Sequence, residues 1–275
     1  MMQFNEETFR QNIGSEKKSL RFVGQDMQIL NPLFFLAVEE RDSRAVAAMA
    51  RRQADAGADA LDLNLGPAKK NSSLLAWAIE TVRAAVDLPL FVASQILATP
   101  DLLQQYQGSI TINSVTADPA TLAADMERAG KCGAGLVVLL TKPGQSVFSA
   151  DDRLLLAAEV LETAARTGFS LDRLYLDPLF RPSPQGLPDL EPVLETLAAL
   201  PFLSQEKVNT VAALSSASAF LPAAKRPALH QRLLPLLAEA GLDTVILNCN
   251  DRALMEIGRC LSDCPAQPLC QAAIA

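Results

Sequence analysis

Small polar side chains recur where short apolar runs of this sequence end. Asp62 and Asn64 close one run, Asn113 closes another and Asp177 a third. A buried carboxylate accepts paired N–H donors, and an Asn amide both donates and accepts a hydrogen bond on one edge. Isolated groups of this kind suit a flat, nitrogen-rich heterocycle. The structural alternative at each position is capping of the next helix, a common use of Asp and Asn at strand ends.

Hydroxyl groups gather near two further run ends. Ser215, Ser216 and Ser218 follow a late run, and Ser94 follows an early one. No catalytic His or Cys nucleophile motif accompanies them. The acids stand on separate runs rather than in a cluster of the kind that holds Mg²⁺. Hydroxyl, amide and carboxyl groups therefore form the predicted site.

The cysteines and the single histidine do not indicate a metal site. Five cysteines occur without any Cys-x-x-Cys pair, at positions 132, 249, 260, 264 and 270. Zinc sites usually need such pairs or several histidines. We therefore expect free thiols and no bound metal. His230 is the only histidine, and we expect it on the surface of a helix.

Eight short apolar runs, which we interpret as strands, alternate with longer amphipathic segments, which we interpret as helices. The runs are Leu20–Gly24, Ala60–Gly66, Leu88–Ala93, Ser109–Val115, Gly135–Thr141, Leu174–Leu179, Val208–Ser216 and Thr244–Asn250. Eight such units in about 255 residues match a closed (β/α)8 TIM barrel, which typically takes roughly 250. The competing doubly wound sheet usually has a Gly-rich turn after its first strand, and none follows Gly24.

One segment illustrates the helical pattern. Ser43–Ala56 places Val46, Met49, Ala50 and Gln53 on one face. Asp42 or Ser43 is in position to cap its start, and Gly57 stands where a helix-ending glycine is typical. In a barrel of such units, active sites form at the carboxyl ends of the strands, where the polar residues above fall. We expect residues 1–19 to form an N-terminal arm and residues 20–275 a single barrel domain.

Composition limits the classes of partner. The net charge of −7 argues against nucleic acid, whose binders usually carry a basic face. No run approaches the roughly 18 apolar residues that would predict a membrane span. The N-terminus is polar and lacks the apolar stretch of a secretory signal. These features predict a cytoplasmic protein with neither nucleic acid nor membrane as a partner.

Three motifs in order carry a family resemblance. They are Gly-Ala-Asp-Ala-Leu-Asp-Leu-Asn-Leu-Gly-Pro at 57–67, Ile-Asn-Ser at 112–114 and Leu-Tyr-Leu-Asp-Pro-Leu at 174–179. With them, the chain resembles the pterin-binding family, and within it the methyltetrahydrofolate:corrinoid/iron-sulfur protein methyltransferases. The resemblance runs from about residue 20 to the C-terminus. It implies a pterin-binding TIM barrel, commonly a cytoplasmic homodimer.

The resemblance also implies an activity. The enzyme would move the N5-methyl group between methyltetrahydrofolate, or a related reduced pterin, and the cobalt of a corrinoid. No sequence feature here would hold cobalamin, so a separate corrinoid protein would bring it. The implied pterin ligands are Asn113 and Asp177, while Asp62 and Asn64 would shape the floor of the site.

At several positions the sequence departs from the family pattern. The family's strand-three Asp falls at Ala93, and Ser94 or a water is expected to fill part of that place. The family's strand-seven Asn near N5 falls at Ser216, which becomes the catalytic candidate, with Ser215 and Ser218 as further substrate-binding candidates. A serine hydroxyl is too weakly acidic to protonate N5, so Ser216 would orient N5 or relay a proton from water. The strand-one motif has become Gly-Gln-Asp-Met-Gln at 24–28.

Two other readings remain open. The departures are compatible with a catalytically silent paralogue that binds a pterin or a corrinoid protein. Dihydropteroate synthase, which shares the barrel and the pterin pocket, is the less favoured reading. It needs basic residues at the ends of strands seven and eight, where this chain has Ser215–Ser218 and Asn248–Asn250.

Overall fold

Eight parallel strands close into a barrel in sequence order, and β8 pairs with β1 to complete the ring. The computed structural model describes residues 20–66, 72–106, 108–144, 149–181 and 189–263. The strands are β1 (Arg21–Gln28), β2 (Ala60–Asn64), β3 (Leu90–Val92), β4 (Ile110–Thr116), β5 (Gly135–Leu139), β6 (Leu174–Asp177), β7 (Asn209–Ala213) and β8 (Thr244–Leu247). The predicted (β/α)8 barrel is therefore confirmed. The expected arm at residues 1–19 lies outside the described residues.

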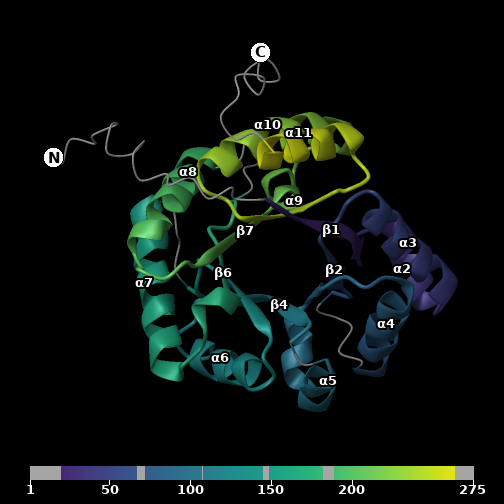
Figure 1. Ribbon diagram of the computed structural model, residues 1–275, viewed down its shortest axis with the longest axis horizontal. Coiled ribbons are helices and arrows are strands. Elements are labelled where there is room, and N and C mark those ends of the chain that lie inside the picture. Colours follow the sequence, from purple (N-terminus) through teal and green to yellow (C-terminus); the bar gives the residue numbers. More distant parts are fainter. Residues whose placement is uncertain (1–19, 67–71, 107, 145–148, 182–188, 264–275) are drawn as a thin grey trace.

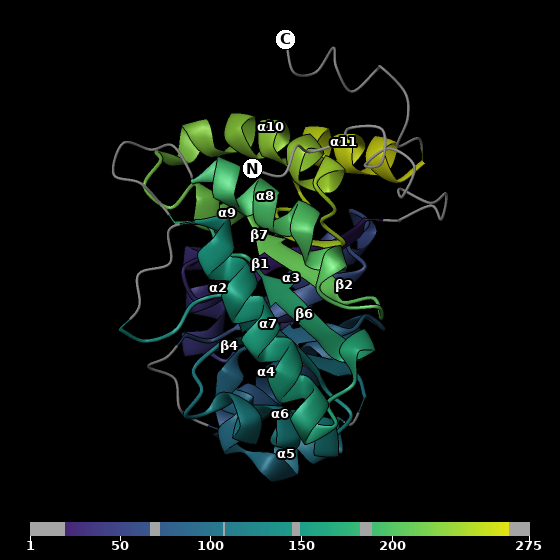
Figure 2. The ribbon, with the colours of Figure 1, turned by 90° about the vertical axis from the view of Figure 1, so that its left-hand side faces the viewer.

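A ring of helices surrounds the barrel (Figure 1), and Figure 2 shows its α7 side. In chain order these are α3 (Ser43–Asp55), α4 (Ser72–Ala85), α5 (Pro100–Gln105), α6 (Leu122–Lys131), α7 (Ala150–Thr167), α8 (Leu190–Ala199), α10 (Arg226–Glu239) and α11 (Arg252–Asp263). Two further helices are α2 (Pro32–Glu39), which lies between β1 and α3, and the short α9 (Leu214–Ala217), which follows β7 directly. None of the described helices is both long and apolar enough to cross a membrane.

Helix α3 forms as its sequence pattern predicts. The Asp42 carboxylate caps its start by accepting hydrogen bonds from the backbone N–H groups of Arg44 and Ala45, at 2.9 and 3.0 Å. The predicted inward face, which includes Met49 and Gln53, is buried. Gly57 follows with a φ of 99°, a left-handed conformation that favours glycine. The helix thus begins and ends where cap chemistry allows.

Strand β1 is longer than its apolar run. We predicted an end at Gly24, whereas the strand continues to Gln28 with a shift in register between Gly24 and Met27. Gly24 has no side chain, and a Cβ there would lie 2.4 Å from Gln53 Oε1. That oxygen accepts a hydrogen bond from the Asp26 backbone N–H at 2.9 Å. A buried amide from α3 therefore supports the irregular part of the strand, which apolar patterning does not reveal.

A dry layer of side chains fills the middle of the barrel. In barrels of this type, tilted strands stack inward-facing side chains in layers of four from alternate strands. The middle layer consists of Val23, Phe91, Val137 and Val211, and each is 0% exposed. Tyr175 packs beneath it, with its ring edge-to-face on Phe91 at 5.6 Å between centroids. This apolar layer separates the carboxyl end of the barrel, called the mouth below, from the amino end, called the floor.

Candidate functional site

The next layer toward the mouth brings three predicted site residues together. In the strand registers, Asp62 on β2 is the partner of Phe91 on β3, and Phe91 is the partner of Thr111 on β4. Asn113 lies two residues beyond Thr111, and the strand tilt brings it to the height of Asp62. The registers of the remaining strands continue this stagger around the ring. They place Asp177 on β6 and Ile246 on β8 in the same layer. Two carboxyl groups and an amide therefore stand above the dry layer.

Asp62 and Asn113 interact directly. Asn113 Nδ2 donates a hydrogen bond to Asp62 Oδ1 at 2.9 Å. Asp62 is only 6% exposed. Burial raises the pKa of its carboxyl group to about 6, and the hydrogen bond from Asn113 opposes that rise. Burial thus disfavours the ionised form of Asp62, and a ligand N–H donor placed against this carboxyl group would favour ionisation.

Asp177 is the second buried carboxyl group of this layer. Its Oδ1 accepts a hydrogen bond from the Leu179 backbone N–H at 2.7 Å. Burial raises its pKa to about 7, against the opposing effects of this hydrogen bond and of the positive charge on Arg153. Leu179 has a φ of 56°, a conformation that side-chain-bearing residues rarely adopt. A strained turn therefore orients one face of the Asp177 carboxyl group.

Arg153 on α7 holds that turn and was missed in the sequence. Its side chain is 1% exposed. Nε donates to the Pro178 carbonyl at 2.7 Å, and Nη2 donates to the Leu179 carbonyl at 3.3 Å. Nη2 also lies 3.4 Å from the carboxylate of Asp189. The available signal was spacing, since Arg153 falls three and four residues before the buried Leu156 and Ala157.

The wall above the three polar residues is mostly small or apolar. By strand alternation it consists of Gln25, Ala93, Leu139 and Ala213. Two of these four side chains are alanines, so each contributes only a methyl group to the wall. The Gln25 Oε1 atom is buried and has no hydrogen-bond partner among the described residues. Buried polar atoms are nearly always paired, so this oxygen is a candidate acceptor for a ligand N–H.

Asn64 and Ser94 lie at the same end of the barrel with different surroundings. Asn64 Oδ1 accepts a hydrogen bond from the Gly66 backbone N–H at 2.9 Å, which shapes the turn after β2. Ser94 begins the short 3-10 helix η1 (Ser94–Ala98), next to Ala93, and is half-buried. The Asn64 side chain is thus engaged in this turn, and Ser94 lies next to Ala93.

The three serines after β7 have different surroundings. Ser215 and Ser216 are half-buried on α9, directly after the strand. Within the described residues, the Ser216 hydroxyl has no hydrogen-bond partner. Ser218 is 0% exposed, and its hydroxyl pairs with His230 Nε2 at 2.8 Å. Ser218 is therefore bound within the packing of α9 on α10, and a ligand binding role for it stays a prediction without geometric support.

The expected surface position of His230 is wrong. The residue is 5% exposed, and burial lowers the pKa of its imidazole. His230 lies three and four residues before the buried Leu233 and Leu234, so helical spacing places it on the inward face of α10. There its Nε2 pairs with the Ser218 hydroxyl, which also lies 3.3 Å from the Ser215 carbonyl oxygen.

The cysteines and other possible metal ligands form no cluster in the described part of the chain. Cys132, Cys249 and Cys260 are free thiols, while Cys264 and Cys270 lie outside the described residues. In the described part of the chain, no group of three or more His, Cys, Asp or Glu side chains is arranged to hold a metal ion.

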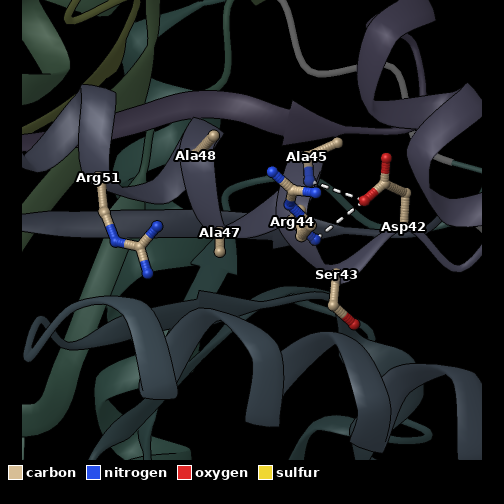
Figure 3. A pocket seen from close by; sticks show the side chains of 7 residues that line it. All are labelled: Asp42, Ser43, Arg44, Ala45, Ala47, Ala48 and Arg51. Carbon is tan, nitrogen blue, oxygen red and sulfur yellow. Dashed lines mark hydrogen bonds between the residues drawn. The ribbon is translucent and has the colours of Figure 1, made fainter.

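A hollow of about 630 Å³ lies against α3, and none of the candidate site residues lines it. Figure 3 shows the side chains that do. Three alanines and two arginines contribute to its lining, and the Asp42 carboxylate is engaged in capping the helix. This hollow offers no convergent set of polar groups. The mouth layer, rather than this hollow, is the candidate site.

Comparison with known proteins supports the barrel fold. No family model matches the sequence. A dihydropteroate synthase from Xanthomonas albilineans with 4-aminobenzoic acid superposes with a TM-score of 0.66 at 20% identity, covering 92% of this chain and 96% of that one. The Yersinia pestis enzyme with a pterine-sulfa conjugate gives 0.67 at 16%, covering 91% and 94%. The Coxiella burnetii enzyme with pteroic acid gives 0.62 at 15%, covering 89% and 92%. At these identities the likeness establishes a shared (β/α)8 barrel along nearly the whole chain.

Proposed function

We propose that the mouth binds the pterin ring of a reduced folate and that the protein is a methyltransferase. The N5-methyl group would move between methyltetrahydrofolate, or a related reduced pterin, and the cobalt of a corrinoid on a separate protein. The observation that carries the pterin site is the layer formed by Asp62, Asn113 and Asp177. Solved barrels of similar fold that hold pteroic acid or 7,8-dihydropteroate support the ring class.

The chemistry of this layer fits the aminopyrimidine edge of a pterin. That edge presents an amino group and ring nitrogens, and paired N–H donors match a carboxylate. Donors placed against Asp62 and Asp177 would favour the ionised carboxyl groups, whose pKa values burial raises to about 6 and about 7. Gln25 Oε1 supplies a further buried acceptor. The small side chains of Ala93 and Ala213 would favour the approach of a flat ring.

Ser216 is the proposed residue at the reacting nitrogen. The methyl group would leave without the electron pair of the broken bond. That pair stays on the atom that loses the methyl group, which is N5 in one direction and cobalt in the other. Transfer from folate to the reduced cobalt leaves the N–C electron pair on N5, which then takes up a proton. The Ser216 hydroxyl, which has no partner among the described residues, would orient N5 or relay that proton from water.

An apolar surface near the mouth supports a protein partner. Leu30, Leu33 and Leu36 are 85%, 62% and 53% exposed, and they lie on the connection that follows the carboxyl end of β1. Adjacent exposed leucines of this kind are typical of interaction sites. A corrinoid protein that covers them would approach the same end of the barrel as the proposed pterin. The homodimer that the resemblance implies remains part of this proposal.

The test is titration calorimetry with methyltetrahydrofolate, followed by spectroscopic methyl transfer to Co(I) cobalamin. We expect binding, and a loss of ten- to a hundredfold in affinity for Asp177→Ala, because one charge-assisted hydrogen bond contributes about 1.5–3 kcal/mol. Asp55→Ala, at an exposed carboxylate on α3, is the control and should bind as the wild type does.

Each outcome separates the readings. Binding with transfer supports the methyltransferase. Binding without transfer, also with a corrinoid protein as acceptor, favours the silent pterin-binding paralogue. No binding, or equal affinity in Asp177→Ala, would overturn the pterin site. Ala93→Asp adds a check, since restoring a carboxyl group should tighten binding, and weaker binding would indicate a site built for another ligand.

Dihydropteroate synthase is the second candidate, and the similar solved structures favour it. A dihydropteroate synthase would need basic side chains at the ends of β7 and β8, where this chain has serines and asparagines. Lys142, a nearby cation, is paired with Glu159 at 3.3 Å. Formation of 7,8-dihydropteroate from 4-aminobenzoic acid and a dihydropterin diphosphate would establish this activity and replace the methyltransferase proposal.

A further inference from the structure

A second polar hollow opens at the floor of the barrel, the end opposite the proposed pterin site. Its volume is about 370 Å³. It lies at the starts of β1, β4, β5 and β6 and against the segment before β3. Basic and hydroxyl groups dominate its polar lining, contributed by Arg21, Arg83, Arg173, Tyr175, Thr111 and Ser109. The dry layer of the barrel separates this hollow from the mouth.

Arg21 is the central residue of this floor. It lies two residues before the inward-facing Val23, so strand alternation points it into the barrel below the dry layer. It is half-buried, and its Nη1 donates to the Tyr175 hydroxyl at 3.2 Å. Tyr175 is its only side-chain partner among the described residues, and no described carboxylate pairs with it. A partly buried guanidinium without a carboxylate has unmet capacity for an anion.

Two glycines shape the floor closely around its polar groups. A Cβ at Gly135 would lie 2.7 Å from Thr111 Oγ1, and one at Gly133 would lie 2.8 Å from Arg173 Nη1. Gly133 also has a φ of 61°. A side chain at either position would meet Thr111 or Arg173, so the two glycines leave room for both polar groups at the hollow.

The rim adds positive charge on a protein that is acidic as a whole. Arg83 donates to Ser109 Oγ at 2.9 Å and lies over the Tyr106 ring at 5.5 Å, which holds its guanidinium beside the hollow. Two carboxylates, Asp87 and Asp172, also line the hollow, and Asp172 is 4.0 Å from Arg173. Three guanidinium groups against two carboxylates leave an excess of positive charge, in contrast to the net −7 of the chain.

We propose that this floor binds the phosphate group of a small phosphorylated metabolite. A tetrahedral oxyanion accepts hydrogen bonds from several directions, which matches guanidinium and hydroxyl donors from different strands better than a planar carboxylate does. The hollow falls within the range of roughly 300–1,000 Å³ that is typical of small-molecule sites. Because the dry layer intervenes, this ligand and a ligand at the mouth bind without steric competition.

The test is thermal unfolding and titration calorimetry with inorganic phosphate, with sodium chloride added to hold ionic strength constant. We expect phosphate to raise the Tm of the wild-type protein and Arg21→Gln to weaken phosphate affinity by about tenfold or more. Arg166→Gln, at an exposed arginine on α7 outside the hollow, is the matched control and should retain wild-type affinity. A Tm shift absent at constant ionic strength, or equal in Arg21→Gln, would overturn the proposal.

A second variant and a second ligand complete the test. If Arg21→Gln fails to fold, Arg173→Gln at the exposed rim should still lower phosphate affinity severalfold, and unchanged affinity there would count against the site. Succinate at the same ionic strength tests a dicarboxylate, and tighter binding of succinate than of phosphate would reject a phosphate ligand. Methyltetrahydrofolate titration of the same variants should be unchanged, so failure at the floor and failure at the mouth are distinguishable.

Discussion

The side chains of Asp62 and Asn113 meet across the end of β3, with Asn113 Nδ2 2.9 Å from Asp62 Oδ1. The two residues come from strands that are not neighbours. Strand β3 lies between them and ends at Val92, and the next inward-facing position toward the mouth is Ala93, whose side chain is a single methyl group. The hydrogen bond therefore ties the site together before any ligand is bound.

Removing the donor of this pair should destabilise the protein in a pH-dependent way. Asn113→Ala takes away a hydrogen bond that favours the ionised carboxyl group of Asp62, so the pKa of Asp62 should rise further. We expect a loss of about 1–3 kcal/mol in the free energy of unfolding at pH 8, and a smaller loss at pH 5. Urea denaturation at both values measures this. Equal losses would mean that ionisation of Asp62 does not contribute.

The buried carboxyl group of Asp177 should make stability fall as pH rises. Its pKa is about 7 in the folded protein against an ordinary 3.8, so between about pH 4 and 7 the folded state keeps a proton that the unfolded chain has lost. Its contribution is complete at low pH and is lost across that window. Asp177→Asn should therefore be more stable than the wild type at pH 8, by on the order of a few kcal/mol at about 1.4 kcal/mol per pKa unit. Guanidinium denaturation at pH 5 and 8 measures the difference, and an unchanged difference at the two values would contradict it.

Arg153 should be required for both stability and ligand affinity. Arg153→Met removes the donors that hold the Pro178 and Leu179 carbonyls and leaves Asp189 with one cation fewer. A loss of about 3–5 kcal/mol is typical when one partner of a buried charged network is removed. At a temperature where the variant is folded, pterin affinity should also fall, since the turn that orients Asp177 is released. Arg166→Gln on the same helix controls for loss of charge, and wild-type pterin affinity in Arg153→Met would limit Arg153 to a role in stability.

The histidine offers a measurement without any chemical label. Because His230 is the only histidine, a single imidazole resonance in a proton NMR titration reports its pKa. We expect a pKa below 6.5, since burial disfavours the charged ring more than Asp251 and a backbone hydrogen bond favour it. His230 then contributes stability above about pH 6.5 that is lost as the pH falls toward its folded pKa. A pKa of His230 at or above 6.5 would contradict the buried environment. Removal of its partner in Ser218→Ala should lower the free energy of unfolding by about 1–2 kcal/mol.

The barrel was predictable because its strands are apolar on both faces and its helices are amphipathic. The ends of the strands were not predictable, since several predicted runs extend past the observed end of the strand. Val208–Ser216, for example, was read as one strand, whereas β7 stops at Ala213 and α9 begins at Leu214. Leu214 remains buried in the helix. Apolar character continues through the turn there, and only hydrogen bonding between strands marks the boundary.

The candidate site was predictable to the extent that it lies on the strands. Asp62, Asn113 and Asp177 are positioned by strand register, so the pattern that predicts the barrel also places them at one end. Ser218 and Arg153 are positioned by helix packing outside the barrel. Their partners are far from them in sequence or belong to the backbone, so residue type alone does not identify them.

The apolar layer in the middle of the barrel has a consequence for engineering. Val23, Phe91, Val137 and Val211 leave no polar path between the two ends, and substitutions at distant sites without shared partners combine nearly additively. Changes made at one end should therefore transfer unchanged into a background altered at the other. The chain is in this sense a two-ended scaffold, on which either opening can be redesigned while the other serves as an internal reference.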